Sequence, residues 1–212
     1  MQPKLFIGVC NSQNTVPSAF HWSWEAIDKP YEYEKVRFSH DDAVIRNNEM
    51  IGAFLKRDSD ILVKMDVDQK YRKDYLTAMV PLVEKYKLIG PLIYSKRRRN
   101  NYSPLLYEED IYPLKRQIDW EKRTPENGIL PIYYAHTNLF YHREVLESVE
   151  PPWYEAKYNE DCSDYKISRD FSFLEKLIKK GFKTYINMNM VVGHLVEETV
   201  NTKTHKMWNE RK

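Results

Sequence analysis

The chain has 212 residues, enough for one compact domain with its own core, and its 42% hydrophobic content argues against an intrinsically disordered protein. The formal net charge of +2 is too small to indicate nucleic-acid binding by itself. No segment approaches the roughly 20 apolar residues that span a bilayer, and the N-terminus lacks the apolar region of a signal peptide. We therefore expect a single domain over residues 1–212, in a cytoplasmic protein without a membrane anchor, and composition leaves the oligomeric state open.

The first half of the chain alternates between strand and helix patterns. Short apolar or alternating runs predict strands at residues 5–10, 31–36, 60–68 and 88–94. Apolar residues at helical spacing predict helices at residues 18–27, 43–55 and 75–86. Asp41 or Asp42 is the expected cap of the second helix, and Gly90-Pro91 suggests a bulge in the fourth strand. This alternation predicts an α/β fold with a largely parallel sheet.

The second half begins with a polar, charged segment at residues 96–127, which is too long for a simple connection and reads as a functional excursion or a mobile loop. It opens with the basic run Lys96-Arg97-Arg98-Arg99. Strands are expected at residues 129–135, 184–186 and 191–192. Helices are expected at residues 143–149 and 169–180, the second capped by Ser168 and ended by Gly181.

Two carboxylates follow the most apolar of the predicted strands. Asp66-Val67-Asp68 lies at its C-terminal end, the edge at which open α/β sheets bind ligands. Alternate side chains there can reach one side and share a divalent ion, and carboxylate oxygens suit Mg²⁺ or Mn²⁺, which substrate phosphates and water usually complete. Such a cation would neutralise the charge that grows on a nucleoside diphosphate leaving group. The alternative interpretation is a solvated acidic turn.

Two further candidates lie late in the chain. His194 follows Gly193, and neutral imidazole is a good ligand for Mn²⁺, although an isolated histidine is more often structural. Asp170, near the start of a predicted helix, has the chemistry of a general base, or it serves only to favour the helix N-terminus electrostatically. Cys10 and Cys162 lie far apart in the sequence and are interpreted as buried or idle thiols.

The order and spacing of these motifs resemble the GT-A glycosyltransferases, particularly small phage-encoded members. In that family an Asp opens a helix that ends in Gly, a strand follows, and a Gly-His pair closes the site, as Asp170, Gly181 and His194 do here. The resemblance extends from about residue 4 to 195. It implies a single GT-A domain with a Rossmann-like, mostly parallel sheet flanked by helices. Its nucleotide-sugar-binding half would be residues 1–95, its acceptor-binding and catalytic half 96–195, and its polar tail 196–212.

The resemblance also implies roles for the metal ligands and the base. Asp66 and Asp68 match the Asp-x-Asp that contacts the metal, Mn²⁺ or Mg²⁺, and the ribose–diphosphate, with Asp68 as the more direct ligand. His194 matches a late metal ligand. Asp170 matches the catalytic base of inverting members.

For the donor, the resemblance implies contacts from four other residues. Asn11 and Arg46 lie where the family usually touches the nucleotide, and Lys96 and Arg97 would hold the diphosphate or a polyanionic acceptor. The implied reaction moves a sugar, glucose in the first instance, from a UDP-sugar to an acceptor hydroxyl.

The acceptor is the least determined partner. Modified DNA with hydroxymethylated pyrimidines is one hypothesis, since the basic run 96–99 suits phosphate contacts, and a cell-envelope glycan is the other. Arg169 stands where the family has an acidic residue, and His136-Thr137-Asn138 replaces a glycine-containing stretch, so acceptor and stereochemistry stay open. A nucleotidyltransferase would carry a glycine-rich phosphate loop after the first strand, and a non-catalytic nucleic-acid-binding module would not need the acidic residues and His194 together.

Overall fold

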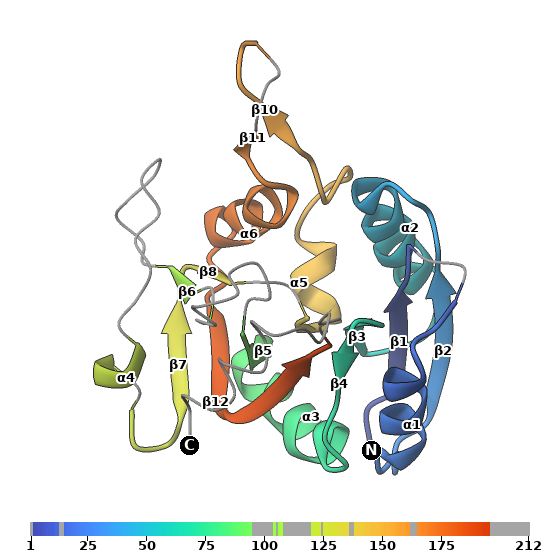
Figure 1. Ribbon diagram of the computed structural model, residues 1–212. Helices are drawn as coiled ribbons and strands as arrows, with labels where there is room; N and C mark the ends of the chain where they lie inside the picture. The colour runs from blue at the N-terminus through green and yellow to red at the C-terminus, as the bar shows by residue number, and fades with distance from the viewer. Residues whose placement is uncertain are drawn as a thin grey trace, which may run out of the picture.

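The computed structural model of the protein describes residues 2–12, 15–94, 104, 106–107, 120–123, 125–135, 138–161 and 165–195 (Figure 1). The helices are α1 (Ser18–Ala26), α2 (Ala43–Leu55), α3 (Tyr75–Tyr86), α4 (Trp120–Arg123), α5 (Arg143–Glu147) and α6 (Arg169–Lys179). No helix in these ranges combines the length and the apolar character that a bilayer crossing requires.

Within the described residues, eight strands form the central sheet in the order β2-β1-β3-β9-β5-β12-β4, with β7 also paired to β12. Their bounds are β1 (Leu5–Cys10), β2 (Tyr33–Phe38), β3 (Ile61–Asp66), β4 (Gln69–Lys70), β5 (Leu88–Ile93), β7 (Ile129–Ile132), β9 (Phe140–His142) and β12 (Thr184–His194). Two small ribbons lie outside this sheet: β6 (Leu106–Tyr107) with β8 (Tyr134–Ala135), and β10 (Lys157–Tyr158) with β11 (Tyr165–Ile167). The β10–β11 ribbon projects beyond α6 (Figure 1).

The direction of the strands fixes where a site can form. β2, β1, β3, β5 and β12 run the same way, while β9 lies antiparallel between β3 and β5. The mostly parallel α/β sheet predicted from the sequence is therefore confirmed, with β9 as an unpredicted central exception. The carboxyl ends of β1, β3, β5 and β12 meet at one edge of the sheet, the usual ligand-binding edge of such folds.

The two faces of the sheet carry separate hydrophobic cores because successive strand residues point to opposite sides. Phe6 and Leu62 belong to the core that includes the apolar residues of α2, α5 and α6. Ile7 and Val63, one residue further along their strands, belong to the core shared with α1 and α3. The same alternation assigns Lys64 and Asp66 to the face covered by α2, α5 and α6.

Most predicted elements are present, with shifted ends. The helix predicted at 75–86 is α3, and α6 begins at the predicted cap, where Ser168 Oγ accepts from the N–H of Phe171 at 3.5 Å. Gly181, just beyond α6, has φ +90°, a backbone conformation that glycine adopts at no steric cost.

Three strand predictions were wrong in detail. The single strand predicted at 129–135 is split into β7 and β8, which belong to different sheets, and the two late strands form one continuous β12. The irregularity expected at Gly90-Pro91 lies on the partner strand, because the register of β12 against β5 shifts between Asn187 and Val191, opposite Pro91. A proline provides no N–H to the ladder, which is consistent with a break there.

The cap of α2 gives a test of the local fold. Asp42 Oδ1 accepts from the N–H groups of Val44 at 2.6 Å and Ile45 at 3.4 Å. We expect Asp42→Ala to lower the free energy of unfolding by about 1 kcal/mol, measured by urea denaturation. Asp41→Ala is the matched control and should change it little. Equal losses in the two variants would contradict the assigned cap.

Candidate active site

The end of β3 and the end of β12 bring together residues that are distant in the sequence. Asp66, the last residue of β3, is in register with Cys10, the last residue of β1, and Asn11 follows directly. Asp68 lies between β3 and β4, and the short β4 pairs with the end of β12, so that His194 is in register with Gln69. Asp66, Asp68 and His194, predicted as a metal site, thus share one edge of the sheet.

Asp68 and His194 face one another at this edge. The Nε2 atom of His194 lies 3.7 Å from Oδ2 of Asp68, and the two side chains are 20% and 39% exposed. The backbone N–H of Leu195 donates to the carbonyl of Asp68 at 2.7 Å, which holds the two segments together. Both side chains are therefore partly exposed to solvent.

The tautomer of His194 follows from its other contact. Its Nδ1 atom lies 2.7 Å from the carbonyl oxygen of Tyr94. A carbonyl only accepts, so Nδ1 carries a proton and donates, and Nε2 is the ring nitrogen next to Asp68. One carboxylate oxygen and one imidazole nitrogen are a donor set suited to Mn²⁺ or Mg²⁺.

The described part of the chain offers two neighbouring side chains, Asp68 and His194, as ligands for such a cation. Among the described residues, no group of three or more His, Cys, Asp or Glu side chains is arranged to hold a metal ion. A site with two protein ligands still fits Mg²⁺ or Mn²⁺, because these ions keep several waters and take oxygens from substrate phosphates. The arrangement fits a cation that binds together with a diphosphate.

Asp66 has different surroundings from Asp68. The ammonium of Lys64 lies 3.2 and 3.3 Å from the two carboxylate oxygens of Asp66, and it donates to Oδ1 of Asn138 at 3.4 Å. Burial alone would lower the pKa of Lys64, but the charge of Asp66, with a smaller contribution from Asp170, raises this pKa above its ordinary value. Lys64 is therefore a buried cation.

The sequence interpretation missed Lys64 because it lies within an apolar run. A signal was present, since a lysine two residues before an aspartate in a strand shares its face. Asn138 is the last residue of the stretch His136-Thr137-Asn138. The sequence did not predict that its side chain accepts a hydrogen bond from Lys64. Residues 136 and 137 lie outside the described part of the chain.

Asp170 belongs to the same region. It is buried in the first turn of α6, and its Oδ1 atom lies 3.9 Å from Nε of Arg169. Its charge acts on the buried Lys64 and raises the pKa values of Tyr141 and Tyr154, whose first cause is burial. Asp170 therefore lies on the same face of the sheet as Asp66. It is close enough to influence Lys64, the ion-pair partner of Asp66.

Asn11 and Arg46, predicted to contact the nucleotide, have partners within the chain. Asn11 is buried, and its Nδ2 atom donates to the carbonyl of Thr15 at 3.3 Å. Arg46 donates from Nη1 to the carbonyls of His40 and Asp41, while its Nε atom is buried without a hydrogen-bond partner among the described residues. Both lie near the carboxyl end of β1. Asn11 directly follows Cys10, the last residue of that strand, and the charge of Arg46 acts on the thiol of Cys10.

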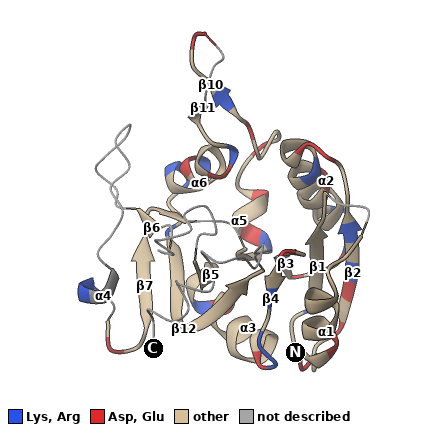
Figure 2. Ribbon diagram, in the orientation of Figure 1, with Lys and Arg blue, Asp and Glu red and all other residues tan. Residues whose placement is uncertain are grey.

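Lys96 and Arg97, predicted to hold the diphosphate or an acceptor, lie outside the described residues. Over the described ribbon, Lys and Arg are interspersed with Asp and Glu (Figure 2).

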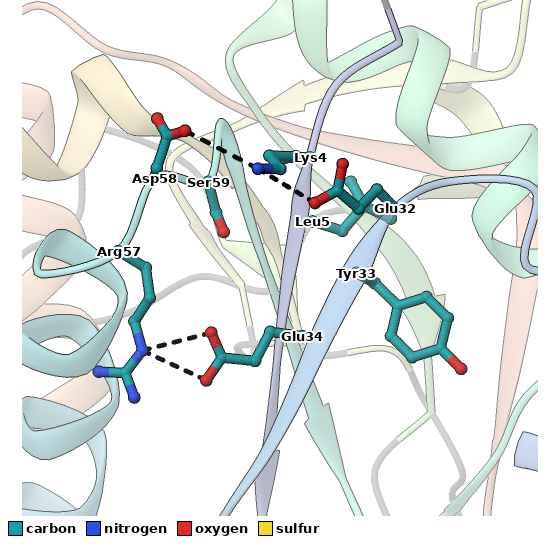
Figure 3. A pocket seen from close by; sticks show the side chains of 8 residues that line it. All are labelled: Lys4, Leu5, Glu32, Tyr33, Glu34, Arg57, Asp58 and Ser59. Atoms are coloured by element: carbon teal, nitrogen blue, oxygen red, sulfur yellow. Dashed lines mark hydrogen bonds and ion pairs between the residues drawn. The ribbon is translucent and has the colours of Figure 1, made fainter.

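A surface depression at the opposite edge of the sheet has a different character (Figure 3). It lies at the start of β1 and β2 and is lined by Lys4, Leu5, Glu32, Tyr33, Glu34, Arg57, Asp58 and Ser59. Its charges pair with each other, Lys4 with Glu32 at 3.0 Å and Arg57 with Glu34 at 3.3 Å. It is remote from the carboxyl ends of the strands, so we do not assign the chemistry to it.

Comparisons with known proteins bear on the fold. No protein-family model matches the sequence, and no curated protein matches it. Among solved structures, A197 from STIV is similar with a TM-score of 0.60 and 20% identity, over 92% of this chain and 86% of that one. GalNAc-T7, solved with UDP, GalNAc and Mn²⁺, is similar with a TM-score of 0.60 and 11% identity, over 97% of this chain.

These likenesses confirm the GT-A fold class predicted from the sequence. At such low identity they show the fold alone. The chain spans about half of the GalNAc-T7 chain, which it matches over 47% of its length.

The thiol of Cys10 reports on the packing beside this site. It is buried, with Sγ 3.6 Å from Oδ1 of Asn47, and burial raises its pKa to about 11. Below that pH the thiol stays protonated and poorly nucleophilic. In a Cys162→Ser background we expect native protein at pH 8 to react with a disulfide reagent at least about 100-fold more slowly than unfolded protein. Equal rates would contradict the assigned burial.

Proposed function

We propose that the protein is a metal-dependent glycosyltransferase that moves a sugar from a UDP-sugar, glucose in the first instance, to an acceptor hydroxyl. The observation that carries the proposal is the pair Asp68 and His194, 3.7 Å apart at the carboxyl edge of the sheet. A carboxylate and a neutral imidazole at this edge suit a cation that carries a diphosphate. The fold likeness to GalNAc-T7, solved with UDP, GalNAc and Mn²⁺, supports this donor chemistry.

In this proposal Asp68 and His194 would hold Mn²⁺ or Mg²⁺ together with the diphosphate of the donor. When bound, the cation supplies neutralisation of the negative charge on the departing UDP. The contact from Tyr94 to Nδ1 keeps the imidazole in the tautomer that presents Nε2. Asn11 and Arg46, near the end of β1, are proposed contacts of the nucleotide.

Asp170 is the proposed general base. Its carboxylate accepts the proton of the acceptor hydroxyl while the hydroxyl oxygen bonds to the anomeric carbon and the bond from that carbon to the UDP oxygen breaks. A single displacement of this kind inverts the anomeric configuration. The coupling of Asp170 with Lys64 supports a location close to the donor carboxylates.

Removal of the proposed metal ligand tests the reaction class. We expect Asp68→Ala to lower Mn²⁺-dependent hydrolysis of UDP-glucose by about 100-fold or more, because several kcal/mol of charge stabilisation is lost. Release of UDP can be followed by a coupled assay. Asp58→Ala, at the opposite edge of the sheet, is the control and should retain activity.

Full activity of Asp68→Ala would contradict the proposal. Absence of hydrolysis in the wild-type protein with a panel of nucleotide-sugars, together with no thermal shift, would favour the nucleotidyltransferase or the non-catalytic binding module.

The acceptor is tested by mass spectrometry. We propose hydroxymethylated pyrimidine DNA as the first acceptor to examine, and its sequence support is the basic run 96–99. Incubation with Mn²⁺ and UDP-glucose should add the mass of one hexose to the nucleoside, and Asp170→Asn should bind donor but form no product. Unmodified DNA is the matched control. Unchanged nucleosides with retained donor hydrolysis would instead indicate a glycan acceptor.

A further inference from the structure

Lys64 is a buried charge that the proposed reaction does not use directly. It is 4% exposed, while its strand neighbours Ile61, Leu62, Val63 and Met65 are fully buried and apolar. Its ammonium contacts both oxygens of Asp66, at 3.2 and 3.3 Å.

Stability alone does not account for this ion pair. Removing a lysine ammonium from water is costly, and replacing a buried ion pair with apolar residues of similar volume is often neutral or stabilising. The rest of β3 consists of such apolar residues. The pair is therefore better explained by what it does to Asp66 and to the segments around it.

A chain of hydrogen bonds links Lys64 to the strand beside His194. Oδ1 of Asn138 accepts from Lys64 at 3.4 Å, and Nδ2 of Asn138 donates to Tyr71 Oη at 3.0 Å and to Oε1 of Gln69. Tyr71 Oη also accepts from the backbone N–H of Asp66 at 2.9 Å. Gln69 is the residue of β4 in register with His194.

The carboxylates of Asp66 and Asp68 have different surroundings in this network. Both oxygens of Asp66 lie within 3.3 Å of the same ammonium, so its charge is compensated inside the protein. Asp68 lies beyond the strand and faces the imidazole of His194 instead. Among the described residues, the two carboxylates of one Asp-x-Asp sequence thus have different ionisable neighbours, Lys64 for Asp66 and His194 for Asp68.

We propose that Lys64 is a positioning residue that commits Asp66 to an internal ion pair and leaves Asp68, with His194, to bind the divalent cation. Through Asn138 it also fixes β4 against the end of β3. This inference rests on the proposed function for the identity of the ligand, a divalent cation. It assigns Lys64 no contact with the substrate.

The test compares the Mn²⁺ affinity of single and double variants, measured by electron paramagnetic resonance with Mn²⁺ alone. Asp66→Asn leaves the Lys64 ammonium uncompensated and should weaken Mn²⁺ binding by about tenfold, whereas Asp68→Asn removes a ligand and should weaken it by at least about tenfold with or without Lys64→Met. Lys64→Met leaves Asp66 without the ammonium beside it and should tighten Mn²⁺ binding by about tenfold. The double variant Lys64→Met/Asp66→Asn, which contains neither charge, should return to the wild-type affinity.

This design separates positioning from a merely structural role. Loss of packing would lower the thermal unfolding temperature without tightening Mn²⁺ binding. If Lys64→Met does not fold, the Mn²⁺ affinity of the double variant is compared with that of the wild-type protein instead. A weakening by Asp66→Asn that persists in the double variant, or no Mn²⁺ binding by the wild-type protein, would overturn the inference. Mn²⁺ binding that follows the predicted pattern without turnover of UDP-sugars would remove the proposed function and leave the role of Lys64 standing.

Discussion

The pairing of β4 with the end of β12 is the contact on which the candidate site depends. It is only two residues long, Gly193 with Lys70 and His194 with Gln69, and the N–H of Leu195 extends it to the carbonyl of Asp68. Without it, the imidazole and the carboxylate would belong to separate loops. Because β4 begins immediately after Asp68, a short ladder is enough to fix the distance between the two side chains.

The central sheet determines where the ends of the strands lie and which face carries the charged residues of the site. Parallel strands place the ends of β1, β3, β5 and β12 at one edge, and the alternation of side chains places Lys64 and Asp66 on the face covered by α6. Asp170, in the first turn of α6, therefore lies on the same face as Asp66, and its charge acts on Lys64. One buried ammonium, that of Lys64, lies under the influence of both acidic residues.

Local patterns predicted the elements with a clear period, and tertiary pairing decided the rest. α3 has the predicted bounds because its apolar residues follow helical spacing. β9 was not predicted, since three residues give too little pattern and its role depends on neighbours from elsewhere in the chain. Asp68 and His194 were named from the sequence, but no local pattern encodes the β4–β12 register. Lys64 was visible in the sequence, yet only its burial reveals that it pairs with Asp66.

We propose that Asp68 and His194 form a cation site at the carboxyl edge of the sheet. Anomalous diffraction at the manganese absorption edge, from crystals grown with Mn²⁺ and UDP, tests it most directly. We expect an anomalous peak in contact with a carboxylate oxygen of Asp68 and Nε2 of His194, with the diphosphate next to it. A peak on Asp66 alone, or no peak at this edge while UDP is bound, would contradict it.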